Sequence, residues 1–484
     1  MKLPGFVGPS YVAQSPIAGA DELWNLFPEV EQVPGQAEPR TTLYRDPGLR
    51  SFATVGLGPI RGVFRQDGRV WAASGAELYE VFVDGSATLR GAIAAGYGPV
   101  QFASNGTGGL QLAVLASGYL YVLGLTTNTL TLVADADLTT YQGRIASIGF
   151  VDGYGMAHIR DTAQFFISAL EDFTSWDPTD VFQKSKTADL VKVMVIDHGQ
   201  AWLFGSETIE PWYDQGDANT PFAPVPDVMI MQGILSEDAY TLIDNTIFWA
   251  GDTEDGGRVV YRAAGFNPQR ISTHALEAEW RTYGTVEDCT CWAYQHQGHN
   301  FVQFDFPTEG VSWVFDTLGF WHKRGYWNAN AGSFEAHLGR CHVYAFDKHL
   351  VGSRVDGTIY EQTPDVYSDA GAPQRWLRRA PILRRELLNI PHGNFYVHAD
   401  VGSTPLLSGQ GSDPHMMMRF SDTAGRTWSV ERWRSMGSQG EYGGEILWNR
   451  LGMAKGPHGR IYEISGTDPV PIALVEAGIN ARRG

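Results

Sequence analysis

Residues 69–85 read RVWAASGAELYEVFVDG and contain two short runs in which apolar and polar residues alternate. Alternation with a period of two is typical of half-buried β-strands. The first run is centred on Trp71, and the second extends from Leu78 to Val83. Asp84 and Gly85 follow, a dipeptide that favours a turn with positive φ, so the stretch predicts an antiparallel hairpin closed at this dipeptide.

Similar hairpin patterns recur along the chain. Their first strands are centred on Trp71, Leu120, Phe165, Trp202, Phe248, Phe301 and Leu350. A weak repeat of ~40–50 residues with several short strands per unit is typical of β-propeller blades. We therefore predict a β-propeller of six or seven blades, whose closure the pattern leaves open. A series of unrelated hairpins in a β-sandwich would space its strands similarly and stays the alternative.

The composition agrees with an all-β protein and excludes several other classes. Aromatic residues are 12% and charged residues 19% of the 484, whereas disordered chains have few aromatics and many charges. No segment has a sustained helical stripe, and none approaches the ~20 apolar residues of a membrane span. The N-terminus is interrupted by proline and glycine, so we expect no signal peptide.

Three regions differ in character. Residues 1–50 are Pro-rich, and we predict an irregular N-terminal arm lying on another surface. The repeats place the β-propeller at residues 51–372, and a junction with Gly371, Pro373 and Pro381 follows. Four strand-like runs after it predict a small C-terminal β-sandwich over residues 373–484.

Charge is distributed unevenly between these regions. The net charge is −18, which argues against general nucleic-acid binding. Residues 375–484 contain 14 basic and 10 acidic residues, whereas residues 1–374 contain 22 and 44. The densest basic cluster is our candidate interface: Arg375, Arg378, Arg379, Arg384 and Arg385.

We predict that these arginines form inter-domain or inter-subunit ion pairs, because a guanidinium binds carboxylates with two hydrogen bonds. Charge reversal at Arg378 and Arg379 is expected to impair assembly while leaving the fold intact. A phosphate-binding role for the cluster is the alternative.

No catalytic, cofactor or metal site can be assigned from the sequence. The common P-loop, nucleophile-elbow and zinc-protease motifs are absent. Cys289, Cys291, His296 and His299 resemble a metal-ligand set, but a C-x-C spacing is a weak zinc signal, and buried free thiols are the simpler interpretation. With only three cysteines in the chain, we expect no disulfide framework and a reducing compartment.

Residues 421–428 read SDTAGRTW and are similar to the Asp-box turn of sialidase-type propellers, with Asp422 one place early and Thr423 in the usual aspartate position. An Asp box is a structural turn, so we expect a stabilised hairpin here.

A set of short motifs occurs in order over nearly the whole chain. They are Leu23–Glu29, Pro47–Leu49, Arg61-Gly62, Leu203–Glu210, Trp212-Tyr213, Gln232–Ile234, Arg270–Thr273, Gly298-His299, Trp313–Asp316, Trp321–Arg324, Phe420–Asp422, Gly425–Trp428, Gly440–Tyr442, Trp448–Gly452 and Asp468–Pro471. Together these motifs resemble the packaged-DNA stabilisation proteins, or tail hub (nozzle) proteins, of short-tailed bacteriophages. The sequence departs from the family pattern at Thr423, Gly443-Gly444 and residues 455–458.

The resemblance implies a structural virion component and no enzyme. It implies a six-fold ring below the head-to-tail connector that continues the DNA channel, helps retain the packaged genome and mediates its ejection. The implied partners are further copies of this chain, the connector protein and a distal needle, tip or fibre, and assembly would occur in the host cytoplasm. A glycan-binding or glycoside-hydrolase-like propeller is the alternative, suggested by the aromatic content.

The acidity of the chain predicts how DNA would pass through such a ring. An acidic or neutral channel wall repels a duplex, so DNA would slide without sequence-specific binding. The excess carboxylates could instead cover the outer surface and maintain solubility.

Overall fold

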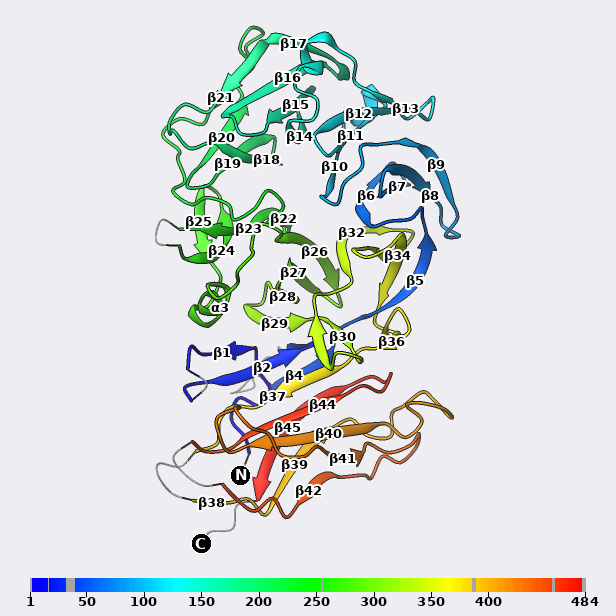
Figure 1. Ribbon diagram of the computed structural model, residues 1–484, viewed down its shortest axis with the longest axis vertical. Coiled ribbons are helices and arrows are strands. Elements are labelled where there is room, and N and C mark those ends of the chain that lie inside the picture. The colour runs from blue at the N-terminus through cyan, green and yellow to red at the C-terminus, as the bar shows by residue number, and fades with distance from the viewer. Residues whose placement is uncertain are drawn as a thin grey trace.

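The computed structural model describes residues 2–15, 17–31, 40–253, 256–384, 389–454 and 458–480, and it is built almost entirely of strands (Figure 1). A large ring of sheets forms one part of the molecule, and two packed sheets form the other. This arrangement confirms the all-β prediction of a propeller joined to a sandwich.

Within the described residues, seven units of four antiparallel strands form the blades of the propeller; five are separate sheets, and two are parts of larger sheets. Blades one to three consist of β6 (Ile60–Gln66), β7 (Arg69–Ser74), β8 (Glu77–Val81), β9 (Ala87–Ala92); β10 (Val100–Ser104), β11 (Gln111–Ala116), β12 (Tyr119–Gly124), β13 (Thr129–Leu132); and β14 (Ile145–Val151), β15 (Tyr154–Ile159), β16 (Gln164–Leu170), β17 (Asp172–Gln183). Blades four to six consist of β18 (Val191–Asp197), β19 (Gln200–Gly205), β20 (Ile209–Asp214), β21 (Phe222–Pro224); β22 (Tyr240–Ile243), β23 (Thr246–Asp252), β24 (Arg258–Ala264), β25 (Asn267–Arg270); and β26 (Thr290–His296), β27 (His299–Phe306), β28 (Val311–Asp316), β29 (Phe320–Arg324).

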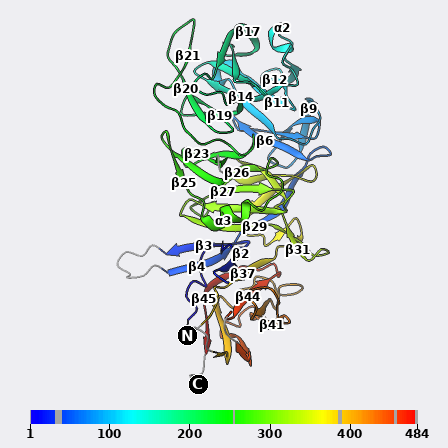
Figure 2. The ribbon, with the colours of Figure 1, turned by 60° about the vertical axis from the view of Figure 1, so that its left-hand side comes forward.

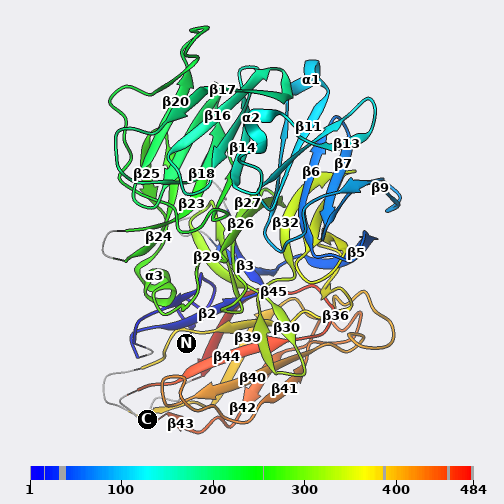
Figure 3. The same cartoon turned by 45° about the horizontal axis from the view of Figure 1, so that its top comes forward.

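The seventh blade closes the ring with a strand from the other end of the propeller sequence. Its strands are β32 (Gly339–Ala345), β33 (Lys348–Ser353), β34 (Thr358–Thr363) and β5 (Gly48–Thr54). β5 pairs with β34 in antiparallel register, so the two ends of the ring share one sheet. The first strand of each blade lies toward the centre of the ring (Figure 1), and Figure 3 shows the same ring with its top turned forward.

The turn that we predicted from the opening sequence lies one strand further along. Gly75 and Ala76 join β7 to β8, whereas Asp84 and Gly85 join β8 to β9. Gly85 has φ +81°, and a Cβ there would lie 2.5 Å from the Phe52 carbonyl oxygen of β5. Glycine therefore allows the turn to approach the closing strand.

The sandwich consists of two five-stranded layers. One layer has the order β2 (Ala20–Trp24), β37 (Trp376–Arg379), β44 (Ile461–Gly466), β40 (His415–Ser421), β41 (Arg432–Ser435). The other has the order β3 (Leu26–Glu31), β4 (Arg40–Arg45), β45 (Ala473–Asn480), β39 (Asn394–Ala399), β42 (Ile446–Asn449). Their shared core contains Trp376 and Trp448 together with Leu23, Leu26 and Leu43 of the N-terminal region.

The predicted irregular arm is therefore wrong in its local structure. β2, β3 and β4 complete both layers of the sandwich, because their apolar side chains fill its core and their backbones pair with β37 and β45. β2 also makes one parallel pairing with β29, so a single sheet runs from blade six into the sandwich (Figure 2). The exact limits at residues 50 and 372 remain a prediction.

The remaining elements are short. They are β1 (Tyr11–Val12), β30 (Tyr326–Asn328), β31 (Ser333–Glu335), β35 (Ser368–Asp369), β36 (Ala372–Pro373), β38 (Ile390–Pro391), β43 (Met453–Ala454), α1 (Gly106–Gly109), α2 (Ala136–Thr139) and α3 (His274–Trp280). In the part of the chain that the structure describes, no helix has the length and apolar character needed to cross a membrane.

Candidate functional site at the propeller–sandwich junction

The candidate arginines lie in very different surroundings. Arg378 and Arg379 are on β37, between β2 and β44, and Arg375 precedes the strand. Arg378 is 1% exposed, whereas Arg384 is exposed. Arg385 lies outside the described residues. Three of the five arginines are thus collected at the junction, and the exposed Arg384 lies apart from them.

Arg378 fastens the first residues of the chain to the sandwich. Its Nε donates to the Phe6 carbonyl oxygen at 2.6 Å, and its Nη2 donates to the Gly5 carbonyl oxygen at 2.7 Å. Asp21 lies 3.5 Å from the same Nη2. Burial lowers the pKa of Arg378 to about 10, against the opposing effect of Asp21. We had expected charge reversal at Arg378 to leave the fold intact. In the structure, a carboxylate at this position would be buried facing carbonyl oxygens, so we now expect charge reversal to destabilise the fold.

Arg379 connects the arm with the interior of the sandwich. It forms an ion pair with Glu22 of β2, and its Nη2 lies 2.7 Å from Glu463 Oε2 on β44. Glu463 is 1% exposed and also pairs with Arg419. Both guanidinium groups lie over the Trp428 ring, at 5.1 Å and 4.7 Å. Buried carboxylates that are paired on two sides hold adjacent strands in one register.

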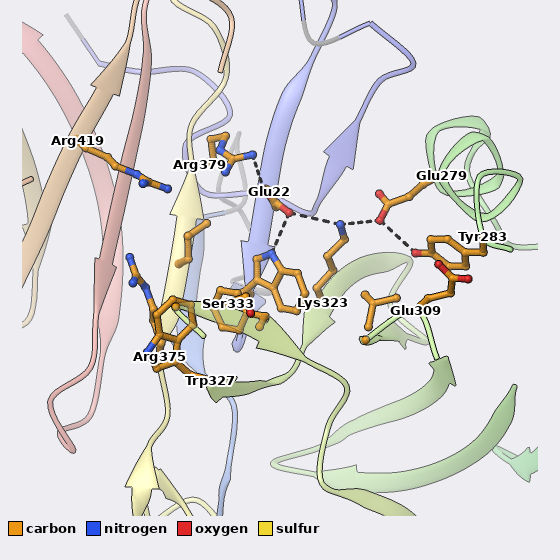
Figure 4. Close-up of a pocket in the computed structure, with 16 residues that line it drawn as sticks. Glu22, Glu279, Tyr283, Glu309, Lys323, Trp327, Ser333, Arg375, Arg379 and Arg419 are labelled. Carbon is orange, nitrogen blue, oxygen red and sulfur yellow. Dashed lines mark hydrogen bonds and ion pairs between the residues drawn. The ribbon is translucent and has the colours of Figure 1, made fainter. Parts of the chain in front are cut away.

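A second chain of contacts runs from Glu22 into the propeller (Figure 4). Lys323 of β29 lies with Nζ 3.4 Å from Glu22 Oε1 and 2.7 Å from Glu279 Oε1 on α3. Tyr283 donates its hydroxyl to the same Glu279 oxygen at 3.2 Å. Burial raises the pKa of Glu22, but Lys323 and Arg379 outweigh it and lower that pKa to about 2. The carboxylate is therefore the shared anion between the propeller and the sandwich.

A cleft of about 430 Å³ lies beside this network. One wall is a series of stacked groups: Trp24 lies 4.2 Å from Phe334 in parallel, Phe334 meets Trp327 edge-on, and the Arg375 guanidinium covers the Trp327 ring at 4.4 Å. The hairpin of β30 and β31 supplies Trp327 and Phe334. The cleft thus has both charged and aromatic walls, contributed by the arm, the propeller and the sandwich.

Asn25 occupies the crossing point of these strands. It lies between β2 and β3 with φ +52°, a conformation that asparagine tolerates better than most residues. Its side-chain amide donates to the Gly325 and Arg375 carbonyl oxygens at 2.9 Å and 2.7 Å, and its oxygen accepts from the Gly325 N–H at 2.9 Å. Asn25 therefore joins the arm, blade six and the sandwich at one buried position.

Glu22→Gln is expected to flatten the acid dependence of stability. The Glu22 pKa is lowered from 4.5 to about 2, so the carboxylate stabilises the fold above pH 4.5, and this contribution is lost as pH falls toward 2. Unfolding by urea, measured in steps from pH 5 to pH 2.5, should show a smaller loss of stability for the variant than for the unchanged protein. Parallel pH curves for the two proteins would contradict the assignment.

A histidine forms a second link between the arm and blade six. His299 of β27 is 3% exposed, with Nδ1 2.7 Å from Asp316 Oδ2, and its Nε2 pairs with Glu29 of β3. The hydrogen bond to Asp316 raises the pKa of His299 to about 9, and Glu29 adds to the effect although burial opposes it. The His299 side chain is therefore held between two carboxylates as a protonated imidazolium.

His299→Gln is expected to remove part of the alkaline pH dependence of stability. A pKa raised from 6.5 to about 9 means that the stabilisation is complete below pH 6.5 and is lost as pH rises through 9. Urea unfolding at pH 6 and pH 10 should show a smaller difference for the variant. An equal difference in the two proteins would show that His299 is not charged in the folded state.

The Asp-box-like turn is stabilised, but by a different residue from the family pattern. Ser421 Oγ accepts from the Thr423 and Gly425 N–H groups at 3.2 Å and 2.9 Å. Asp422 instead forms a two-bonded ion pair with the buried Arg460, at 2.7 Å and 2.8 Å. The aspartate, shifted by one place, thus pairs with the residue that directly precedes the neighbouring strand β44.

The cysteines and histidines do not assemble a metal centre in the described part of the chain. Cys289, Cys291 and Cys341 are free thiols. Burial raises the pKa of each of these thiols. Neutral thiols are poor ligands, so these cysteines behave as small apolar side chains.

Sequence reasoning did not single out Glu22, Asn25, Lys323 and Glu463 as junction residues. Asn25 and Lys323 lie within motifs that carry the family resemblance, which is the signal that could have found them. No local pattern marks Glu22 or Glu463, because their partners are distant in sequence.

Solved structures of similar shape include virginiamycin B lyase from Staphylococcus aureus, with 10% identity, a TM-score of 0.43, and coverage of 65% of this chain and 98% of that chain. A streptogramin B lyase has 8% identity, a TM-score of 0.40, and coverage of 65% and 97%. Likenesses this weak carry no functional argument. No curated protein matches the chain.

Two family models match in succession and together cover both parts of the fold. Residues 20–367 match the model described as bacteriophage P22 Gp10, beta-propeller, and residues 375–482 match the model described as bacteriophage P22 Gp10, beta-sandwich. The first match begins at β2, the strand that lies between propeller and sandwich. The chain is therefore a structural protein of a bacteriophage tail, located in the virion, and it belongs to the P22 Gp10 family.

Proposed function

We propose that the protein is the tail hub, or nozzle, whose copies form a six-fold ring that extends the DNA channel below the head-to-tail connector. The ring helps retain the packaged genome and later mediates its ejection. The observation that carries the proposal is the match of both Gp10 family models, in order, over the propeller and the sandwich. The partners are other copies of the chain, the connector protein and a distal tail protein.

The junction suits a component that carries mechanical load. The sheet that continues from β29 through β2 to β37 links propeller and sandwich by backbone hydrogen bonds. Arg379, Glu22 and Lys323 add ion pairs across the same boundary. A connection made of strands and buried charges resists rotation better than a flexible linker, so each subunit would act as one stiff unit.

The charge distribution supports passage of DNA without adhesion. Residues 1–374 contain 44 acidic and 22 basic residues. Phosphate binding requires basic contacts whose counterions are released, and an acidic or neutral wall offers none. In this proposal DNA is held by mechanical closure and slides freely at ejection. The carboxylates could instead cover the outer face of the ring.

Arg384 is the candidate for contact between subunits or with the connector, because it is exposed while Arg378 is buried. Arg384→Glu should weaken binding to connector particles or ring formation and leave the thermal unfolding of the free protein unchanged.

The function is tested by depleting the protein from infected cells and supplying it again from a plasmid. Particles assembled without it should package DNA and then lose it, and the unchanged protein should restore filled particles. Particles that keep their DNA without the protein would overturn the retention role. Restoration by Arg262→Gln, which removes only a partly exposed ion pair with Asp244 far from the junction, serves as the control that a folded chain is supplied.

A further inference from the structure

The centre of the propeller contains a cavity that the proposed function does not use. Its volume is about 450 Å³, and it is lined by the first strands of five blades, β6, β10, β22, β26 and β32. Leu242 and Tyr344 line it and are 46% and 47% exposed. The cavity is therefore connected to solvent and large enough for a small polar molecule.

Two arginines among the lining residues bring positive charge to this cavity. Arg61 of β6 is 1% exposed, and its Nε, Nη1 and Nη2 donate to the carbonyl oxygens of Gly98, Gly75 and Ala94 and to Ser117 Oγ, at 2.7–2.8 Å. All four acceptors are neutral. Among the described residues no carboxylate forms an ion pair with Arg61, so its charge is fixed in place without a counterion.

Arg340 of β32 is the second cation. Its Nη1 donates to the Tyr97 carbonyl oxygen at 2.8 Å, which is another neutral acceptor. Arg340 forms no ion pair within the described residues. Burial, together with the weaker effect of the nearby Arg340 guanidinium, lowers the pKa of Arg61 to about 10. Burial also lowers the pKa of Arg340. Two like charges that destabilise each other in a partly enclosed space favour an anion between them.

The lining also contains one buried hydroxyl without a partner and one carboxylate. The Thr290 hydroxyl is buried and makes no hydrogen bond among the described residues. Asp238 is the carboxylate of the lining residues, and its pKa is raised to about 6 by burial and by Glu237, against Arg340 and Arg160. Buried hydroxyls usually have a hydrogen-bond partner, so the Thr290 hydroxyl is available to a ligand bound in the cavity.

We propose that the axial cavity of the propeller binds a small oxyanion of the phosphate or carboxylate type, held near Arg61 and Arg340. The Arg340 guanidinium supplies the free donors, Arg61 supplies a fixed positive charge, and the Thr290 hydroxyl supplies a further hydrogen bond. Asp238 opposes binding by its negative charge. The bound ligand would connect the inner strands of several blades and stiffen the propeller from its centre.

The proposal is tested by calorimetric titration of the full chain with sodium phosphate and, separately, sodium acetate, with ionic strength held constant by sodium chloride. We expect saturable binding of at least one oxyanion. Arg340→Gln should weaken it at least tenfold, and Asp238→Asn should strengthen it several-fold. Arg262→Gln, which removes a partly exposed ion pair with Asp244 on blade five, should leave it unchanged.

Each result decides the question. Binding of phosphate alone assigns a phosphate ligand, binding of acetate alone assigns a carboxylate ligand, and binding of both assigns a general oxyanion site. No saturable binding of either anion overturns the proposal. Equal affinity of the unchanged protein and Arg340→Gln for the anion would also overturn the proposal. The same holds if Arg340→Gln and Asp238→Asn change the affinity in the same direction. Asp238→Asn keeps the test valid should Arg340→Gln fail to fold.

Discussion

A fragment limited to residues 373–484 is expected not to fold, although it spans the whole sandwich match. Three strands of the two layers, β2, β3 and β4, come from residues 20–45. Without them Leu23, Leu26 and Leu43 are missing from the core, and each buried leucine contributes about 1.5–3 kcal/mol. The backbone edges of β37 and β45 would also be left unpaired and open to aggregation.

The measurement is thermal unfolding followed by circular dichroism on the fragment, with and without a separately expressed segment of residues 1–50. The fragment alone should show no cooperative transition, and the added segment should restore one. A matched control fuses residues 1–50 to the fragment through a flexible linker, which should fold. A cooperative transition of the fragment alone would show that the arm strands are dispensable.

Arg378→Met is expected to destabilise the sandwich by about 3–5 kcal/mol, the range typical of breaking a buried charged network. Methionine keeps an unbranched chain in the core but leaves the Gly5 and Phe6 carbonyl oxygens and Asp21 without their donor. Buried acceptors without a partner carry the full cost of their lost hydration. Unlike Glu22→Gln, this change also releases the first residues of the chain from the sandwich.

The control for this prediction is Arg384→Met, which removes the same charge from an exposed position five residues after Arg379. Guanidinium-chloride unfolding should place the sandwich transition of Arg378→Met at a clearly lower midpoint, with Arg384→Met close to the unchanged protein. Similar midpoints for both variants would mean that the Arg378 contacts contribute little to stability.

The repeat of hairpins predicted the propeller because each blade must hide apolar side chains on both faces of a short sheet. The seven central residues do lie on strands of seven different blades, but Leu120 and Phe165 are on third strands and the other five are on second strands. That difference explains the short step from Phe165 to Trp202, which runs from a third strand to a second strand. Ring closure by β5 could not be predicted, since β5 and β34 are separated by the entire propeller sequence.

At the junction, too, local sequence patterns could not predict contacts between residues that are distant in the sequence. The arginine cluster was recognisable by its composition, yet its members have different surroundings. Arg378 is buried on β37, which pairs with β2, whereas Arg384 lies beyond the end of that strand and is exposed. The arm was predicted as irregular because Pro28 and the other prolines disfavour central strands. β3 accommodates Pro28 while pairing with β4 on one side only, as the edge strand of its layer.

The central claim, that this chain forms a hub ring on the tail channel, is tested most directly by cryo-electron microscopy of the purified protein mixed with connector particles. The account predicts a six-fold ring attached below the connector, with an open channel continuous with that of the connector and a wall that is acidic or neutral. A protein that stays monomeric in the presence of connectors, or a ring whose channel is lined by arginines, would contradict it.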